Sequence, residues 1–174
     1  MNIDKVEKKL READFFLNKM RQHESKAFGD REPFDFFLSA FLSACRTVDY
    51  RLRHEQPAIY PAWRDAWEAN RAPNESKLIK FIVDDRNTEV HESSSSRSSK
   101  LEGFEVRGSY SDNSGTLEVF GVPTPLFGSG PRATVYKPSY SFNIDGSDRS
   151  ATEVCGEYLK LLTEMIASFK ADNP

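Results

Sequence analysis

The stretch PFDFFLSAFLSACRTVDYRL, residues 33–52, decides the fold that we expect for this chain. Pro33 suits the first turn of a helix, because its missing N–H has no partner to bond there. Few positions are left for water, so we predict that residues 33 to about 54 form the central, most buried helix. The apolar side chains recur at the helical spacing of three or four, as Phe34, Leu38, Phe41, Cys45, Val48 and Leu52, flanked by Phe37, Ala40, Leu42 and Ala44.

A polar seam is predicted along the remaining face of this helix. Its members fall within a narrow arc and are Asp35, Ser39, Arg46 and Tyr50, with Asp49 at the border of the apolar stripe. Such a seam beside a buried helix is the expected place for a functional site, so Asp49 and Arg46 are supporting site candidates. Asp49 could pair with Arg86 of a later helix or be a solvated helix position, and Arg46 could line the site or only make an exposed salt bridge.

Four more helices are predicted from the same spacing. The first covers residues 3–24, and a short one over 62–70 places Trp63 and Trp67 one turn apart as core anchors. A helix over about 75–92 follows, capped by Asn74 or Ser76. The last helix starts after a cap at Asp148 or Ser150 and runs to about residue 171, with the apolar positions Val154, Tyr158, Leu161, Leu162, Met165, Ile166 and Phe169.

The segment between these last two helices has a different residue pattern, without the helical spacing of apolar side chains. The run SSSSRSSK, residues 93–100, is predicted to be a flexible surface connection. FEVRGSY and GTLEVFGV alternate in polarity and are joined by SDNSG, which indicates a β-hairpin, and ATVYKPSYSFNI is expected to add a strand bent at Pro138. The sequence therefore predicts a mainly α fold in one domain, 1–174. A helical bundle (about 3–92 and 148–171) carries a small antiparallel β appendage (about 101–145) before the last helix.

Composition narrows the function classes. With 174 residues, 38% hydrophobic and 29% charged, the chain has the composition of a globular protein. Neither a bilayer-spanning apolar run nor a secretory leader is recognisable, so we expect a cytoplasmic protein without a membrane partner. A net charge of −3 means that binding to nucleic acid would need a local basic patch. Cys45 and Cys155 have no paired spacing and are expected to be buried free thiols, not metal ligands.

The segment DDRNTEVHE, residues 84–92, ends the fourth helix and carries the candidate site. Arg86 lies within an apolar arc, where its charge requires a carboxylate, a phosphate or a partner subunit. Asn87 and His91 are one turn apart on the adjoining edge, with Asp84 on the same face. Such an Arg/His pair suits attack of a ribose 2′-hydroxyl on the neighbouring phosphate, with histidine moving protons and arginine holding the phosphoryl oxygens. That chemistry needs no metal and no cofactor.

The spacing of Arg86 and His91 alone is a weak signal, but its context resembles a known family. An FFLSAFLSA helix followed by a later RN-x-x-x-H helix is similar to HEPN domains, over about residues 5–92 plus the last helix. The resemblance implies a homodimeric helical bundle in which the Arg/His helices of two subunits meet. Many HEPN proteins are metal-independent endoribonucleases of toxin–antitoxin, abortive-infection or CRISPR systems. Arg86, Asn87 and His91 take the motif positions, and an antitoxin protein is a possible partner.

Several interpretations of the Arg/His helix remain open at this point. Arg86 and His91 could simply be cations at a helix C-terminus, where they favour the last carbonyls. Some HEPN proteins bind RNA or nucleotides without cleaving them, and a third possibility is a structural module in which Arg86 makes an interface salt bridge. The gap of four residues is at the short end of the family's range, and the β appendage is not part of the common HEPN core.

Overall fold

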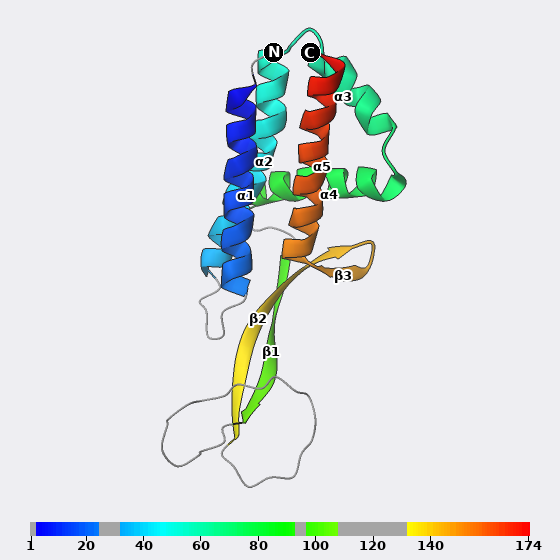
Figure 1. Cartoon of the computed structure of the whole chain (residues 1–174). Helices are drawn as coiled ribbons and strands as arrows, with labels where there is room; N and C mark the ends of the chain where they lie inside the picture. Colours follow the sequence, from blue (N-terminus) through cyan, green and yellow to red (C-terminus); the bar gives the residue numbers. More distant parts are fainter. Residues whose placement is uncertain (1–2, 25–31, 93–96, 108–131) are drawn as a thin grey trace.

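The computed structural model describes residues 3–24, 32–92, 97–107 and 132–174, apart from the side chains of residues 86–92, 100–107 and 132–137. In this part the chain is mainly helical, with a small antiparallel sheet before the last helix (Figure 1), which is the predicted fold class. The elements are α1 (Asp4–Glu24), α2 (Glu32–Glu55), α3 (Tyr60–Ala69), α4 (Pro73–Glu92), β1 (Arg97–Arg107), β2 (Arg132–Ile144), β3 (Ser147–Ser150) and α5 (Ala151–Asp172).

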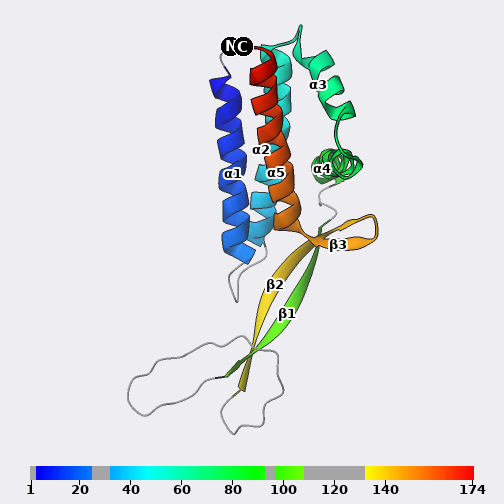
Figure 2. The ribbon, with the colours of Figure 1, turned by 45° about the vertical axis from the view of Figure 1, so that its right-hand side comes forward.

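Three long helices, α1, α2 and α5, lie side by side and form the bundle (Figure 2). The start of α1 and the end of α5 are at the same end of this bundle. The apolar stripe predicted for residues 33–52 is confirmed, because Phe34, Phe41, Val48 and Leu52 have no exposed surface. Cys45 of α2 and Cys155 of α5 are buried free thiols, also as predicted.

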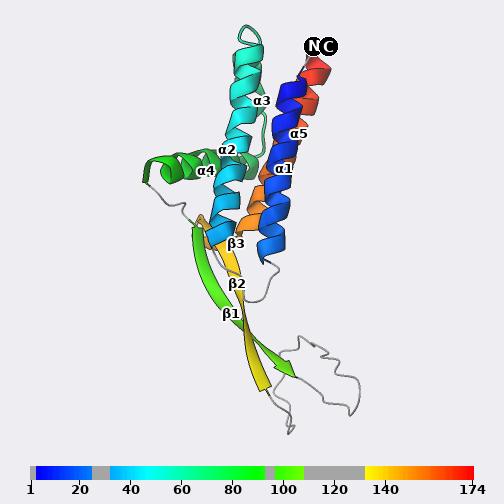
Figure 3. The same ribbon diagram turned by 90° about the vertical axis from the view of Figure 1, so that its left-hand side faces the viewer.

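Helices α3 and α4 cover one side of the bundle. α4 lies across α2 and α5 at a steep angle and extends beyond α2 (Figure 3). In α3, Trp67 is buried and Trp63 is partly buried, with the Trp63 ring 4.9 Å from the ring of Phe169 in α5. Both tryptophans therefore anchor α3 to the core, as the sequence predicted. No helix in the described ranges is both long and apolar enough to cross a lipid bilayer.

The predicted capping residues are right for α5 and wrong for α4. Ser150 Oγ accepts the backbone N–H of Glu153, which caps the first turn of α5. α4 begins at Pro73, ahead of the expected Asn74 or Ser76 cap. The N–H of the preceding residue, Ala72, donates instead to the Glu75 carboxylate at 3.2 Å. Proline needs no partner at the first helical position, so the helix can start there without a capping side chain.

The β region begins earlier than predicted and pairs over a longer range. Residues 97–100, expected in a flexible connection, belong to β1, so that prediction is wrong for this half of the serine run. β1 pairs antiparallel with β2 from Arg97↔Phe142 to Arg107↔Arg132, which confirms a strand over the ATVYKPSYSFNI segment. The sheet order is β1-β2-β3. The predicted strand at 115–122 and its SDNSG turn lie outside the described residues.

β3 was not expected from the sequence, although the sequence carries its turn. Asp145 and Gly146 both have positive φ, 52° and 81°, and connect β2 to β3 as a two-residue hairpin turn. Asp-Gly is one of the pairs that favour this turn, because glycine adopts positive φ without a steric penalty. The β1–β2 arm is joined to the bundle by Phe34 and Tyr140, whose rings stack at 3.6 Å, and by the ion pair between Arg97 and Asp35.

Candidate functional site

A pocket of about 460 Å³ lies where α2, α3, α4 and α5 meet. One part of its wall is charged, and the cations there are Arg46, Arg53, Arg64 and Lys80. The carboxylates are Asp49, Asp65 and Glu68. The pocket therefore brings the polar seam of α2 against residues that come from α3 and α4.

Asp49 is the centre of the charged wall. Its side chain is only 17% exposed, and its Oδ1 accepts the Tyr60 hydroxyl at 2.7 Å. The Nε atom of Arg64 is 3.6 Å from the same oxygen. On the other oxygen, Oδ2, guanidinium nitrogens of Arg53 and Arg46 lie at 3.6 and 4.0 Å. Three arginines thus surround a single carboxylate, and Asp49 is not a solvated helix position.

Tyr60 acts as a neutral donor to Asp49. Burial first, and then the Asp49 charge, raise the pKa of the Tyr60 hydroxyl well above its ordinary value, so the hydroxyl keeps its proton over the whole neutral range. Tyr60 has no exposed surface. This hydrogen bond holds Asp49 through Oδ1, whereas Arg46 and Arg53 approach Oδ2.

Arg64 is the most buried cation of the pocket. It is 9% exposed, its Nη1 donates to Glu68 at 2.6 Å, and its guanidinium lies 5.1 Å from the centre of the Trp67 ring. Its Nε has no hydrogen-bond acceptor among the residues that the structure describes. A guanidinium buried in this way needs carboxylates on either side, because an unpaired charge in an apolar environment is very costly. Asp49 and Glu68 meet that need.

Another part of the pocket wall is apolar. It consists of Ile79 and Val83 of α4 together with Tyr158 and Leu162 of α5. Tyr158 is 6% exposed, and burial, as the first cause, raises the pKa of its hydroxyl, so it too remains neutral. The pocket lining therefore combines cations with an apolar wall formed by α4 and α5.

The predicted site residues divide into those that the pocket includes and those that it does not. Arg46 and Asp49 line the pocket, and Arg46 also forms the exposed salt bridge that was its alternative. Asp84 is exposed on α4 and is not among the lining residues. The backbones of Arg86, Asn87 and His91 lie in the last turns of α4, but their side chains lie outside the described part of the structure. Pairing between Asp49 and Arg86 therefore stays a prediction.

Helical spacing relates these last turns to the pocket. Ser76, Lys80 and Val83 line the pocket and so share one side of α4. Residues 87 and 91 follow Val83 by four and eight positions, which places them on the same side of a continuous helix. The side of α4 that faces the pocket thus continues, one and two turns further on, through Asn87 and His91.

Two buried charged residues were not predicted from the sequence. Arg64 follows Tyr60 by four positions and precedes Trp67 by three, so it falls on the same face as two core aromatics, and this spacing could have revealed it. Asp85 is 3% exposed, on the core side of α4, and follows Ile82 by three positions. It lies near Cys155, whose pKa is raised first by burial and then by Cys45 and Asp85.

In the described ranges, no three His, Cys, Asp or Glu side chains are arranged to hold a metal ion. The pocket cations are instead suited to anionic groups such as phosphate. No protein-family model matches the chain, no curated protein is significantly similar to it, and no solved structure matches it.

Proposed function

We propose that this chain is a HEPN-type, metal-independent endoribonuclease that cleaves RNA along the pocket side of α4. One observation carries the proposal: an arginine-lined pocket lies against α4, and the same side of the helix continues to Asn87 and His91. Phosphate oxygens are natural ligands for such guanidinium groups. The FFLSAFLSA and RN-x-x-x-H motifs of the sequence support the same family and the same site.

The proposed reaction is attack of a ribose 2′-oxygen on the adjacent phosphorus, with departure of the 5′-oxygen of the next nucleotide. His91 takes the 2′-hydroxyl proton or delivers a proton to the leaving oxygen, and Arg86 stabilises the charge on the non-bridging oxygens. Asn87 orients the groove. The products are a 2′,3′-cyclic phosphate and a 5′-hydroxyl, so the bonds and protons balance without a metal or a redox partner.

The active form in this proposal is a cytoplasmic homodimer in which two copies of α4 come together. A single histidine can provide one proton transfer at a time, and a second copy would supply the other acid or base. A protein that masks this groove, such as an antitoxin, would inhibit the enzyme.

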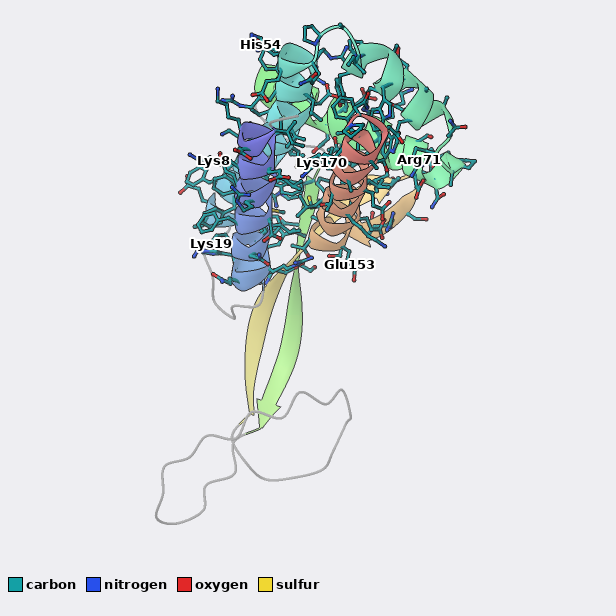
Figure 4. All side chains as sticks on the ribbon, turned by 45° about the horizontal axis from the view of Figure 1, so that its top comes forward. Lys8, Lys19, His54, Arg71, Glu153 and Lys170 are labelled. Carbon is teal, nitrogen blue, oxygen red and sulfur yellow. The ribbon has the colours of Figure 1, made fainter. Side chains whose placement is uncertain are left out.

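The test is cleavage of an unstructured, end-labelled RNA by the purified full-length chain in the presence of EDTA. We expect cleavage that EDTA does not change and that yields 2′,3′-cyclic phosphate ends. His91→Ala should reduce the rate about 100-fold or more, the usual contribution of a general acid or base. His54→Ala is the matched control, because His54 is exposed at the C-terminal end of α2 (Figure 4). This variant should cleave RNA at the same rate as the wild type. Absence of cleavage by the wild type, or equal loss in both variants, would contradict the proposal.

Binding of RNA or a nucleotide without cleavage is the second candidate. The pocket favours it, since Arg46, Arg53 and Lys80 can contact a phosphate without any contribution from His91. Equilibrium binding separates the two: a wild-type chain that binds labelled RNA and leaves it intact after prolonged incubation would establish the second candidate in place of the first.

A further inference from the structure

The pocket around Asp49 has more positive charge than its own carboxylates use. Tyr60 and Arg64 already approach Oδ1 of Asp49, so Arg46 and Arg53 share the other oxygen. Their distances of 4.0 and 3.6 Å exceed the length of an N–H···O hydrogen bond. Each guanidinium carries five N–H donors, and within the described residues Asp49 is the only partner of Arg46 and Arg53, so most of these donors can bind another acceptor.

The exposure of these groups suits a ligand that enters from solvent. The side chains of Arg46 and Arg53 are 51% and 52% exposed, whereas the Arg64 side chain beneath them is only 11% exposed. Lys80 of α4 is also exposed, and within the described residues no ion pair or hydrogen bond occupies its ammonium group. A purely structural salt-bridge cluster would explain why Arg64 is buried here. It would not explain why Arg46, Arg53 and Lys80 line the pocket without a close acceptor for their N–H donors among the described residues.

The apolar wall selects among the possible anions. Inorganic phosphate would contact the cations alone and would not cover the apolar part of the lining, to which Ile79, Val83 and Leu162 contribute. A nucleotide fills both halves, because its phosphate can bind the cations while its sugar and base cover the apolar side.

We infer that this pocket is a phosphate-binding subsite that holds one nucleotide of the RNA strand at a distance from the bond that is cleaved. The inference rests on the proposed function, since it assigns the substrate of that same groove. Arg46, Arg53 and Lys80 bind the phosphate, and the α4–α5 wall receives the nucleoside.

The position of the pocket along α4 sets the length of RNA that is needed. From Val83 to His91 the helix rises about 12 Å, and from Lys80 to His91 about 16 Å, at about 1.5 Å per residue. A single nucleotide cannot span that distance. The subsite therefore predicts tighter binding of an oligonucleotide that reaches both places than of a mononucleotide that reaches one.

The experiment measures equilibrium binding of a labelled, unstructured RNA oligonucleotide to full-length protein carrying His91→Ala, so that cleavage does not interfere. Two variants are made in this background. One is the double variant that carries both Arg46→Ala and Arg53→Ala, and the other carries Lys80→Glu alone. Lys8→Glu is the matched control for charge, because Lys8 is exposed on α1, on the opposite side of the bundle from Arg71 at the α3–α4 junction (Figure 4). Thermal unfolding by circular dichroism checks that each variant is folded, and Lys80→Glu keeps the test decisive if the double variant is not.

We expect the double variant and Lys80→Glu each to weaken RNA binding about tenfold or more, and Lys8→Glu to change it less than twofold. The slope of log K against log salt should fall by up to about 0.7 in the double variant and in Lys80→Glu, because the subsite neutralises a single phosphate. Equal affinities and equal salt slopes in all four proteins would overturn the subsite.

Adenosine monophosphate and inorganic phosphate are the competitor arms. Displacement of the RNA by the mononucleotide, but only at concentrations far above that of the oligonucleotide, supports the extended subsite. Displacement at equal concentrations overturns it in favour of a free-nucleotide pocket. The outcome is separable from that of the proposed function: RNA binding that depends on Lys80 without any cleavage keeps the subsite and rejects the enzyme. Cleavage by the wild type together with unchanged RNA binding in the variants keeps the enzyme and rejects the subsite.

Discussion

Arg64 illustrates how one buried charge organises the pocket. Its guanidinium is held between Asp49 and Glu68 and against the Trp67 ring, and Tyr60 completes the bonds of Asp49. If Arg64 is removed, Asp49 remains mostly buried and keeps the Tyr60 hydrogen bond, but its nearest cations are then Arg46 and Arg53, whose side chains are about half exposed. The loss of a partner from a buried pair is costly because the remaining charge stays desolvated.

We therefore expect Arg64→Ala to lower the free energy of unfolding by about 2 to 3 kcal/mol. Lys160→Ala is the matched comparison, since Lys160 and its ion-pair partner Glu164 are 78% and 46% exposed, and its removal should cost only about 0.5 kcal/mol. Urea denaturation followed by far-UV circular dichroism measures both values. Equal destabilisation by the two substitutions would mean that burial of Arg64 contributes nothing beyond an ordinary surface ion pair.

At the residue scale the sequence indicates which side of α2 is polar but not which partners its side chains find. Asp49 and Arg46 were identified because they interrupt or border an apolar stripe within one helix. Their partner Arg64 comes from α3, and that pairing depends on how two helices pack. The only local sign of Arg64 in the sequence is its helical spacing from Tyr60 and Trp67, and that spacing does not identify Asp49 as its partner.

Among the elements, the junction between α2 and β1 joins the arm to the bundle. Arg97, the first residue of β1, pairs with Asp35 in the first turn of α2 and lies over the stacked rings of Phe34 and Tyr140. The pKa of Asp35 is raised because burial disfavours the carboxylate more than the Arg97 charge favours it. The junction is thus held in spite of a partly desolvated carboxylate.

The raised pKa makes a prediction for stability against pH. The folded chain holds the Asp35 proton more tightly than the unfolded chain, so the Asp35 contribution to stability is greatest at low pH and is lost as pH rises through the folded pKa. Asp35→Asn removes this dependence, and Arg97 keeps its charge throughout. Relative to the wild type, the variant should therefore gain stability as the pH rises from below the ordinary Asp pKa through the raised pKa of folded Asp35.

Urea denaturation at a series of pH values measures this difference. Ser43→Ala, an exposed substitution on the same helix that changes no titrating group, should shift the whole profile by a constant amount. A constant offset for Asp35→Asn as well would contradict the role given to burial.

Helices were predicted better than strands for a physical reason. The period of α1, α2 and α5 is set by neighbours within each helix, so the sequence pattern contains it directly. β1 pairs with residues 25 to 45 positions further along the chain, and the serine-rich half of β1 has none of the β-branched side chains that usually indicate a strand. β3 depends on the Asp145–Gly146 turn, a local signal that is present in the sequence but did not enter the prediction.

Across the whole molecule, the candidate site is a product of packing. α4 crosses α2 and α5, and only this crossing brings Lys80 to Arg46 and Arg53 (Figure 3). The sequence supplied the Arg/His spacing and the polar seam, but no pattern within one helix specifies where two helices cross. The pocket therefore had to come from the structure, while the residues proposed for cleavage come from the sequence.

The proposed dimer gives the last prediction. If two copies of α4 form one composite site, Arg86→Ala and His91→Ala should each be inactive alone. After mixing, denaturation and refolding together, a mixed dimer retains one intact Arg86 and one intact His91 in the same cleft. We expect such a mixture to recover part of the wild-type cleavage rate, and sedimentation equilibrium to give twice the chain mass. Wild-type activity that persists at concentrations where the protein is monomeric, with no recovery on mixing, would instead place a complete site within each chain.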